Sequence, residues 1–375
     1  MGQAYFATVA RGLEPLAVQE LTELGAVDVS PAFTGVHFQG DRALLYRVNL
    51  WSRLIFRVLV PIAEVKAFNA DVLYKSVKKL DWSAYLQPEQ TLAVRCTGSN
   101  PQLNHSHFTA LQIKNAIVDQ QRERYGQRSS IELEQPQIVV NAHIDHNRCH
   151  LSLDSSGVSL HRRGYRPALG LAPLKETLAA AILRLMAWQP QQPLYDPLCG
   201  SGTLLLEAGL QSLRRAPGGF QPQFCFQHWP DFDATLWQAL CQEAQAGELE
   251  HLPAPIWGSD QDSAVIEQAQ ANAERCGLGP HLKLWQQDFR QVEAPAGQGI
   301  LFCNPPYGKR IGNTEALGDF YQLLGDTLKQ RFKGWTAFIL SGNAALTKRI
   351  GLRTARRFPL LNGAIPCTLL KYELY

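Results

Sequence analysis

Apolar and polar positions along the chain predict alternating strands and helices. In the first 65 residues, extended runs at 4–9 and 55–62 and a strand pair at 30–33 and 35–38 are separated by amphipathic stretches at 13–24 and 41–50. Apolar residues at helical spacing indicate one buried helix face, whereas short runs rich in β-branched and aromatic residues indicate strands. This alternation predicts a small α/β unit with a ferredoxin-like order of elements.

The stretch up to residue 165 continues the alternation. The pattern predicts helices at 71–79 and 106–125, a strand at 91–97, and a hairpin formed by 137–144 and 148–154. Three histidines lie around the hairpin turn: His143, His146 and His150. We expect no metal there, because exposed histidines on strands are far commoner than metal ligands.

From residue 166 onward, apolar strands are followed by turns and then by amphipathic helices, which predicts an α/β sheet. Helices are expected at 204–213, 263–276 and 317–332, and the last runs, 354–358 and 367–374, are expected to pair antiparallel at an edge. A chain of 375 residues exceeds the size of a single hydrophobic core, so we expect two or more domains. Gly170 and Pro173 mark a boundary between them.

Composition narrows the class of protein. Hydrophobic residues make up 45% and charged residues 18% of the chain, which are values of a globular protein. No apolar run approaches the length of a membrane span, and the first residues lack the pattern of an export leader. Eight cysteines are scattered without a Cys-x-x-Cys pair, which favours reduced thiols over disulfides or zinc. We expect a cytoplasmic protein without metal or membrane, and leave open whether it is a monomer or a weak dimer.

Charge is informative only locally. The net charge is +3, and residues 1–160 carry as many basic as acidic side chains, so bulk charge marks neither half as a nucleic-acid binder. Attraction to phosphates must therefore come from clusters. Two clusters contain no acid: Arg162, Arg163 and Arg166, and Lys348, Arg349, Arg353, Arg356 and Arg357. A solvated charged face is the alternative interpretation of each.

The tetrapeptide Asn304-Pro305-Pro306-Tyr307 directly follows the apolar run 300–303. Proline cannot donate to a β-ladder, so this run predicts a buried strand that stops at Asn304. In an open α/β sheet, ligands bind beyond the carboxyl ends of the strands. An amide oxygen, a rigid backbone carbonyl and an aromatic face suit a flat ring that bears an amino group. A plain strand-ending turn is the alternative.

A second motif, Asp196-Pro197-Leu198-Cys199-Gly200-Ser201-Gly202-Thr203, has the form of a strand, a glycine turn and a helix start. Glycines let the backbone approach a ligand, and a helix start presents unpaired N–H groups. The dinucleotide fingerprint would need a third glycine where this chain has Leu205, which disfavours a nicotinamide or flavin site. Asp196 favours a ligand with a cationic amino group over a pyrophosphate.

Together the two motifs resemble the class I S-adenosylmethionine-dependent methyltransferases that methylate amines and carry Asn-Pro-Pro-Tyr. The resemblance implies a Rossmann-like methyltransferase domain with S-adenosyl-L-methionine as cofactor. It also implies that Asp260 takes the ribose hydroxyls and that Asp288 faces the adenine amino group. Asp260 lies further from the glycine turn than in a simple βαβ unit, so an insertion at roughly 214–255 is expected. Its aromatic residues are expected to anchor the insertion to the core rather than to stack on bases.

The first half resembles a ferredoxin-like domain followed by a THUMP RNA-binding module, which ends in Leu160-His161-Arg162-Arg163-Gly164-Tyr165-Arg166. The stretch 172–180 also resembles the helix by which THUMP methyltransferases enter their catalytic domain. The implied domains are 1–65, 66–165 and 166–375. The nearest relatives would be bacterial guanine-N2 methyltransferases of large-subunit (23S) ribosomal RNA. Some of these carry a second methyltransferase domain, which we do not expect in a chain that stops at Tyr375.

The expected roles follow from both lines of argument. Asn304 and the Pro305 carbonyl would hold the guanine amine so that its lone pair points at the methyl group, while Tyr307 stacks on the ring. The expected cofactor residues are Asp196, Pro197, Cys199, Gly200, Ser201, Gly202, Thr203, Asp260, Asp288 and Asn304. Arg162, Arg163 and Arg166 would bind RNA. The alternatives are methylation of another RNA or DNA amine, such as guanine N2 of tRNA or adenine N6, of a protein glutamine, or binding of RNA without turnover.

Overall fold

The computed structural model describes residues 2–166, 174–307 and 314–375. The chain forms two compact units, and neither is continuous in sequence. Unit 1 comprises Met1–Val9, Ala17–Leu160 and Gln221–Gln242. Unit 2 comprises Ala10–Leu16, His161–Phe220 and Glu243–Tyr375. None of the described helices has the length and apolar composition needed to cross a membrane.

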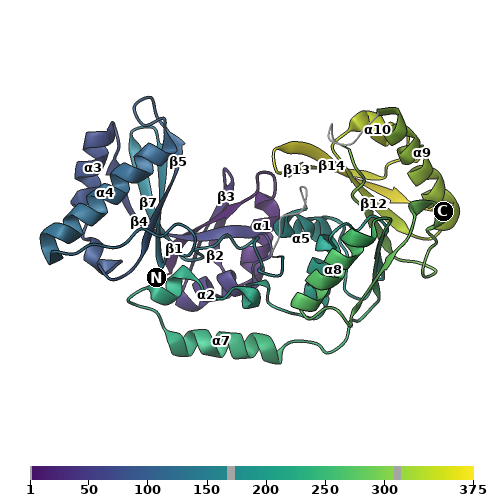
Figure 1. Ribbon diagram of the computed structural model, residues 1–375, viewed down its shortest axis with the longest axis horizontal. Helices are drawn as coiled ribbons and strands as arrows, with labels where there is room; N and C mark the ends of the chain where they lie inside the picture. Colours follow the sequence, from purple (N-terminus) through teal and green to yellow (C-terminus); the bar gives the residue numbers. More distant parts are fainter. Residues whose placement is uncertain (1, 167–173, 308–313) are drawn as a thin grey trace. The chain divides into compact units, whose positions relative to one another are not determined.

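Unit 1 is built on one seven-stranded sheet in the order β2-β3-β1-β4-β7-β6-β5 (Figure 1). The strands are β1 (Gln3–Val9), β2 (Val27–Ala32), β3 (Gly35–Gly40), β4 (Ile55–Lys66), β5 (Leu92–Ser99), β6 (Ile138–Asp145) and β7 (Arg148–Asp154). The helices are α1 (Glu14–Glu23), α2 (Arg42–Trp51), α3 (Ala70–Lys78), α4 (Ser106–Tyr125) and the short 3-10 turn η1 (Trp82–Ala84). The predicted alternation and the 148–154 hairpin are confirmed.

The long strand β4 holds the sheet of unit 1 together. It pairs with β1 from Ile55 to Leu59 and with β7 from Leu59 to Lys66, both antiparallel. The ferredoxin-like elements and the elements that follow therefore share one strand rather than being joined by a linker. The β4–β7 register shifts between Pro61 and Ala63, as expected next to a residue that cannot donate to a ladder.

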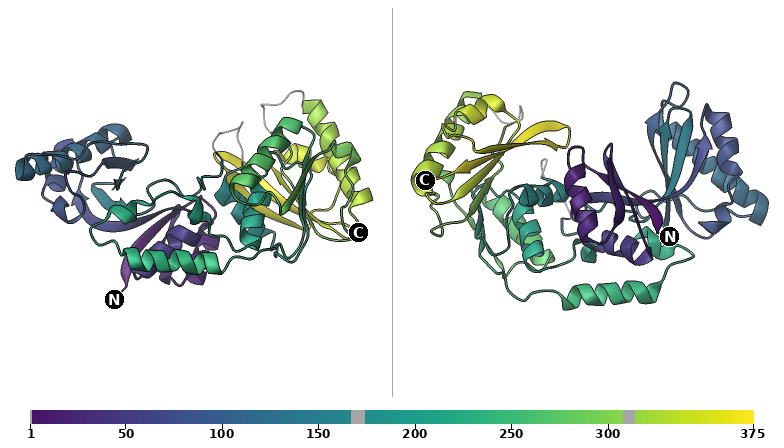
Figure 2. Two further views of the ribbon diagram at one scale, coloured as in Figure 1. Left: turned by 60° about the horizontal axis from the view of Figure 1, so that its bottom comes forward. Right: turned by 180° about the vertical axis from the view of Figure 1, so that it is seen from behind.

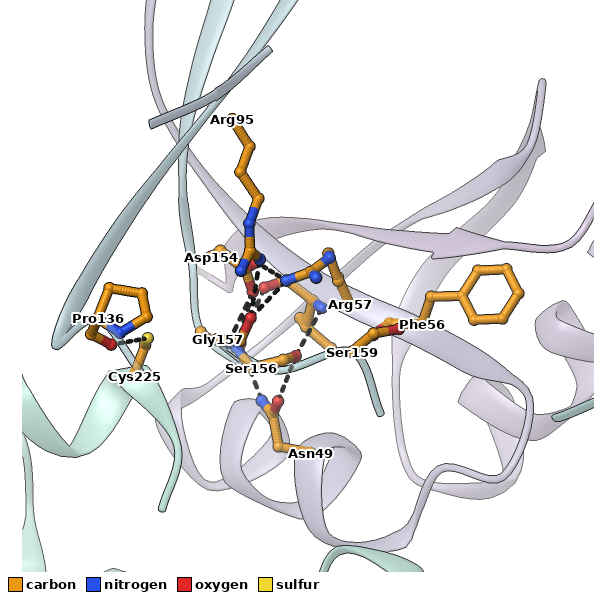
Figure 3. A network of polar contacts seen from close by, with 12 residues as sticks. Asn49, Phe56, Arg57, Arg95, Pro136, Asp154, Ser156, Gly157, Ser159 and Cys225 are labelled. Atoms are coloured by element: carbon orange, nitrogen blue, oxygen red, sulfur yellow. Dashed lines mark hydrogen bonds and ion pairs between the residues drawn. The ribbon is translucent and has the colours of Figure 1, made fainter. Parts of the chain in front are cut away.

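A buried carboxylate at the end of β7 binds one arginine from β4 and one from β5 (Figure 3). Asp154, at the end of β7, is fully buried and accepts from both Arg57 and Arg95. Both arginines also donate to the carbonyl of Gly157, and Asp154 accepts the N–H groups of Ser156 and Gly157. An ionised buried carboxylate needs such partners, because desolvation is otherwise prohibitive.

A segment from the second half of the chain completes unit 1. We call Gln221–Gln242 the strap; it contains η3 (Cys225–His228) and most of α7 (Ala234–Ala246). It runs beside α2 in both views of Figure 2. Phe226 is fully buried and stacks on Tyr46 of α2 with ring centroids 4.4 Å apart. Further aromatic rings surround this pair, namely Phe224, Phe232 and Trp237.

Hydrogen bonds to the backbone of the strap fix it in place. The Phe226 N–H donates to the Ser155 carbonyl over 3.1 Å, and the Gln90 side-chain amide donates to the His228 carbonyl over 2.7 Å. The Tyr46 hydroxyl accepts the Asp233 N–H. The expected anchoring of these aromatic residues to a core is confirmed. The core they join is that of unit 1, although residues 221–242 lie within the predicted 166–375 domain.

Unit 2 contains the second seven-stranded sheet, in the order β10-β9-β8-β11-β12-β14-β13 (Figure 1). The strands are β8 (Leu194–Asp196), β9 (Ile256–Asp260), β10 (Leu282–Gln286), β11 (Ile300–Cys303), β12 (Thr336–Ser341), β13 (Arg356–Asn362) and β14 (Ile365–Glu373). The helices are α5 (Glu176–Leu185), α6 (Thr203–Ser212), α8 (Ser263–Arg275), α9 (Thr314–Arg331) and α10 (Ala344–Lys348), with 3-10 turns η2 (Pro217–Phe220) and η4 (Phe289–Gln291).

Strands β8 to β12 of this sheet are parallel, and the predicted antiparallel edge pair is confirmed. β14 pairs with β12 on one side and with β13 on the other. β13 is the outer strand and carries Pro359, which weakens it as a template for further pairing. From β8, the order runs through β9 and β10 on one side and through β11 and β12 on the other. This reversal between β8 and β11 is the switch point at which open α/β sheets bind ligands.

Replacing Phe226 by alanine should destabilise unit 1 by about 3–5 kcal/mol, because the substitution removes a buried ring from the aromatic cluster. Phe68→Ala is the matched control, since Phe68 is 47% exposed in the same unit. Urea unfolding combined with hydrogen exchange of α2 and β4 would measure both variants. Equal stability of the two variants would contradict the strap's role.

Candidate active site

Strand register brings three polar side chains to one edge of unit 2. Asp196 of β8 is level with Gly258 of β9, and Leu301 of β11 is level with Tyr195. Asp260 and Asn304 therefore lie two residues beyond Asp196, on the two strands that flank it. At about 3.3 Å per residue, each extends roughly 7 Å further along the strand direction. The two sequence motifs and the Asp260 strand tip thus meet at the switch point.

The glycine turn has the predicted form. Gly200 and Gly202 adopt positive φ angles of 53° and 80°, and α6 begins at the next residue, Thr203. A Cβ on Gly200 would meet no atom within 4 Å, so the backbone faces open space there. A Cβ on Gly202 would lie 3.3 Å from that of Ala269 in α8, so this glycine serves packing as well as conformation. The turn is a cradle open toward a ligand.

Asp196 is a buried carboxyl with an unusual proton affinity. The side chain is 3% exposed, and one oxygen accepts the Leu198 N–H over 3.0 Å. Burial, and to a smaller extent the charge of Asp260, raises the pKa of Asp196 well above its usual range. A buried carboxyl whose ionisation is disfavoured gains most from a cationic partner.

Asp260 ties the tips of β8 and β9 together. Its carboxylate accepts the Gly200 N–H over 3.1 Å and the Asp262 N–H over 3.2 Å. The Cys199 N–H donates to the carbonyl of Ser259. The carboxylate thereby holds the glycine turn in shape, and its remaining lone pairs can accept from ligand hydroxyls.

Asp288 follows β10 and caps η4. Its side chain accepts the Arg290 N–H over 2.8 Å and forms an ion pair with the Arg290 guanidinium at 2.5 Å. These hydrogen bonds lower the pKa of Asp288 to about 2. It lines a pocket with Trp285, Gln287 and other polar residues. A contact between Asp288 and an adenine amino group would have to share the carboxylate with Arg290.

Asn304 carries the feature of this edge that most clearly points to a ligand. Its Oδ1 atom is buried and has no hydrogen-bond partner among the residues that the structure describes. A buried acceptor without a donor costs about 1–3 kcal/mol, so such atoms in a folded protein call for an explanation. The neighbouring Pro305 is also buried and lacks an N–H. An incoming amino group would satisfy the amide oxygen.

Tyr307 is held by the β13–β14 hairpin. The Asn362 side chain donates to its hydroxyl over 2.9 Å, and the Cys367 sulfur lies 3.4 Å from the same oxygen. A Cβ on Gly342 would lie 2.8 Å from the ring, so only glycine permits this position of the ring. Burial raises the pKa of Tyr307 to about 12, so the hydroxyl stays neutral. The sequence did not predict that Gly342, Asn362 and Cys367 support Tyr307, because they are distant from it in the chain and close to it only in the fold.

The remaining predicted cofactor residues surround the turn. Pro197, Cys199 and Thr203 are buried, and Ser201 is half-buried. Burial raises the pKa of the Cys199 thiol well above its usual range, which makes it an unreactive packing residue. The Ser201 carbonyl accepts from the Asn272 amide. Across the described parts of the chain, no group of three or more His, Cys, Asp or Glu side chains could hold a metal ion.

Burial contradicts the prediction that Arg163 contacts RNA, and Arg166, which is partly buried, is held in an ion pair. Arg163 is 1% exposed and pairs with Glu207 of α6 at 3.4 Å, and Tyr165 donates to the same carboxylate. Arg166 pairs with Glu176 of α5 at 2.5 Å and donates to the Thr203 hydroxyl. A phosphate cannot reach a buried guanidinium. Only Arg162 of this cluster is exposed.

Glu207 is the residue from which the sequence could have predicted these ion pairs. It follows three leucines in α6 and is fully buried. A buried carboxylate requires a cation or several donors, so its position in an apolar run indicates an arginine partner elsewhere in the chain. Through Thr203 and Glu207, these two arginines hold the first two turns of α6 in place.

Three family models match successive parts of the chain. The RMKL-like methyltransferase domain matches residues 163–371, the THUMP domain matches 67–154, and the RlmL ferredoxin-like domain matches 4–59.

Curated relatives match over the whole chain. A protein of Synechocystis sp., provisionally named an RNA methyltransferase, is 70% identical over 99% of this chain and 97% of its own length. A ribosomal RNA large subunit methyltransferase K/L of Syntrophotalea carbinolica is 44% identical over 99% of this chain. The chain covers 53% of that relative, so it spans about half of its length.

Solved structures share the fold of the full chain. SMU.472, provisionally named a methyltransferase and solved with S-adenosylhomocysteine, superposes with a TM-score of 0.88 at 30% identity, covering 100% of this chain and 98% of that one. A structure from Listeria monocytogenes, named a predicted N6-adenine-specific DNA methylase, has a TM-score of 0.87 at 30% identity, covering 100% and 97%.

Arg163→Ala should destabilise unit 2 by about 3–5 kcal/mol, because it leaves the Glu207 carboxylate buried without its cation. Arg162→Ala, one residue away and exposed, should change stability by less than about 0.5 kcal/mol. Thermal unfolding with hydrogen exchange of α6 measures both. A stable Arg163 variant that loses only RNA affinity would show instead that this arginine contacts RNA.

Proposed function

We propose that this chain, which belongs to the family of RMKL-like methyltransferases with ferredoxin-like and THUMP domains, methylates the exocyclic N2 amine of a guanine in large-subunit ribosomal RNA. The observation that carries the proposal is the buried, unpartnered Asn304 oxygen beside the open glycine turn. The methyltransferase model covers more than half of the chain, and the relatives named as methyltransferases of ribosomal RNA support the substrate class.

S-adenosylmethionine is the cofactor, and it supplies an electrophilic methyl group on a sulfonium when bound. The donor set fits this molecule. Asp196 offers a buried carboxylate for the amino group, and Asp260 offers acceptors for the ribose hydroxyls. Gly200 leaves the space that a bound ligand needs. The pocket that Asp288 lines would receive the adenine ring. The adenine amino group would then share the Asp288 carboxylate with Arg290.

Asn304 and Pro305 would position the substrate amine. The lone pair of an aromatic amine is delocalised into the ring, which makes it a poor nucleophile. Two acceptors that take its N–H groups, the Asn304 oxygen and the Pro305 carbonyl, would turn the lone pair toward the methyl group. This role is one of orientation and electrostatics rather than strong-base catalysis. The amine becomes cationic on transfer and then releases its proton.

Tyr307 would stack on the captured base. Its ring is held by Gly342, and its hydroxyl by Asn362, so the ring is fixed before the base arrives. A base in a duplex must first leave the stack, at a cost of a few kcal/mol. A rigid aromatic face offsets part of that cost.

We further propose the domain limits 1–65, 66–165 and 166–375, with the first two domains selecting the RNA partner. Arg162 remains a candidate contact in that part. We place the protein in the cytoplasm. The second candidate function is methylation of an adenine N6 amine, which the name of the Listeria protein favours and which the same acceptors would serve.

Asn304→Ala should reduce methyl transfer on the order of a hundredfold while leaving cofactor affinity nearly unchanged, because it removes one preorganised contact to the reacting amine. Tyr307→Phe keeps the ring and loses only the hydroxyl anchor, so a cost of about 1 kcal/mol in base capture is expected. Single-turnover assays with labelled donor and saturating RNA measure both. A wild-type rate in Asn304→Ala would reduce the tetrapeptide to a strand-ending turn.

The same labelled donor tests the substrate. Label should appear in ribosomal RNA, and mapping should place it on a guanine N2. Label on adenine N6 would select the second candidate, and label in protein alone would refute both.

Cofactor affinity should fall as pH falls through the raised pKa of Asp196, because only the ionised carboxyl attracts a cationic amino group. Binding near that pH should release a proton, since the bound cation lowers the pKa again. Calorimetric titration in buffers of different ionisation enthalpy detects both effects. Asp196→Asn should weaken binding and abolish the dependence, whereas Asp262→Asn, at the exposed cap of α8, should change neither. Proton uptake on binding would contradict the assignment.

A further inference from the structure

A basic groove lies beside Tyr307 in unit 2. It is lined by the end of β12, α10 and the loop after it, residues of the β13–β14 hairpin, and residues 11–12. Gly342 and Cys367 belong to its lining, and both contact Tyr307. The groove therefore begins at the residue that would stack on the target base.

Four cations line this groove, namely Arg11, Lys348, Arg353 and Arg357, and the last three belong to the basic cluster at residues 348–357. Those last three are exposed, and none of them forms an ion pair with any acidic side chain in the described ranges. Arg349 of the same sequence cluster differs, because it reaches Asp319 and Gln322 of α9 instead. Lys348, Arg353 and Arg357 thus present positive charge that no acidic side chain of the described residues neutralises.

Strand alternation separates the two arginines at the start of β13. Arg357 is level with Leu370 and Pro359 with Thr368, and these four residues all line the groove. Successive side chains of a strand point to opposite faces. Arg356 accordingly does not line the groove and instead packs its guanidinium 4.8 Å from the centroid of the Phe358 ring.

We infer that this groove holds the RNA backbone next to the target nucleotide, with Lys348, Arg353 and Arg357 contacting phosphates. The inference rests on the proposed function and locates where its substrate is held. A base that has left its stack remains tied to its two flanking phosphates, so cations beside the stacking ring are within reach of them. Arginine presents a fork that matches phosphate oxygens, and unpaired cations release counterions from the nucleic acid on binding.

With Arg163 buried and Arg166 partly buried, this groove is the main exposed basic site that we infer for RNA binding. Cations next to an aromatic face are the combination that binds unstacked nucleotides. An acidic protein would match the charge but would leave the adjoining ring without a partner.

Salt-dependent binding tests the groove directly. The variant Lys348→Gln, Arg353→Gln, Arg357→Gln is titrated against a fluorescein-labelled single-stranded RNA and a transcript of large-subunit ribosomal RNA. Fluorescence anisotropy is measured over a series of KCl concentrations. The slope of log affinity against log salt should decrease by about 0.7 per lost phosphate contact with the single strand, or about 2 in total. Affinity at low salt should fall accordingly.

Two further variants keep the outcome specific. Arg356→Gln removes a charge from the neighbouring position on the opposite face and should leave the slope unchanged. Arg353→Lys keeps the charge and should retain most of the affinity. Thermal unfolding and calorimetric titration with S-adenosylmethionine confirm that the fold and the cofactor site are intact.

An unchanged salt slope and RNA affinity in the triple variant would refute the inferred RNA contact. An equal loss of slope and affinity in Arg356→Gln would refute it as well. Either result would leave the proposed methylation standing, because that is decided by label transfer with the wild-type chain. Conversely, a wild-type chain that transfers no label to RNA would refute the proposed function, while the binding isotherms would still decide the groove.

Discussion

Parallel pairing of β8 with β9 and β11 is the constraint on which the candidate site depends. Each strand ends on the same edge because all three run in the same direction, and their register sets how far each tip extends. The central strand stops first, at Asp196, and its neighbours project Asp260 and Asn304 beyond it. A slip by one residue in either pairing would turn the side chains to the other face of the sheet. The chemistry of the site is thus fixed by backbone hydrogen bonds before any ligand arrives.

The polar atoms at this edge differ in how well the protein itself satisfies them. Asp260 is engaged by two backbone N–H groups, and Asp288 by Arg290. By contrast, no described residue donates a hydrogen bond to the Asn304 oxygen, and burial disfavours ionisation of the Asp196 carboxyl. The first pair maintains the shape of the site, while the second pair stores unfavourable free energy that a ligand with amino groups can relieve.

Local sequence was sufficient wherever a feature depended on neighbours in the chain. The strand before Asn304, the glycine turn and the edge pair of the sheet all follow from apolar runs, prolines and glycines within a few residues. It was insufficient where a partner lies far away. Arg163 resembles an exposed phosphate contact until Glu207 is placed beside it, and Tyr307 gains Asn362 only through the fold. Ionic and hydrogen-bond partners at such separations carry no periodicity that a local pattern could reveal.

The strap has a consequence for how the protein is made on the ribosome. Chains emerge from the N-terminus at about 5–20 residues per second, and domains generally fold as they appear. Unit 1 cannot close its aromatic cluster at Tyr46 until Phe226 has been synthesised, by which time β8 and α6 have already been made. Most of unit 1 is synthesised first, yet unit 1 is completed only after β8 and α6 of unit 2 have been made. Its maturation is timed by the translation of a segment that lies between β8 and β9 of the other unit.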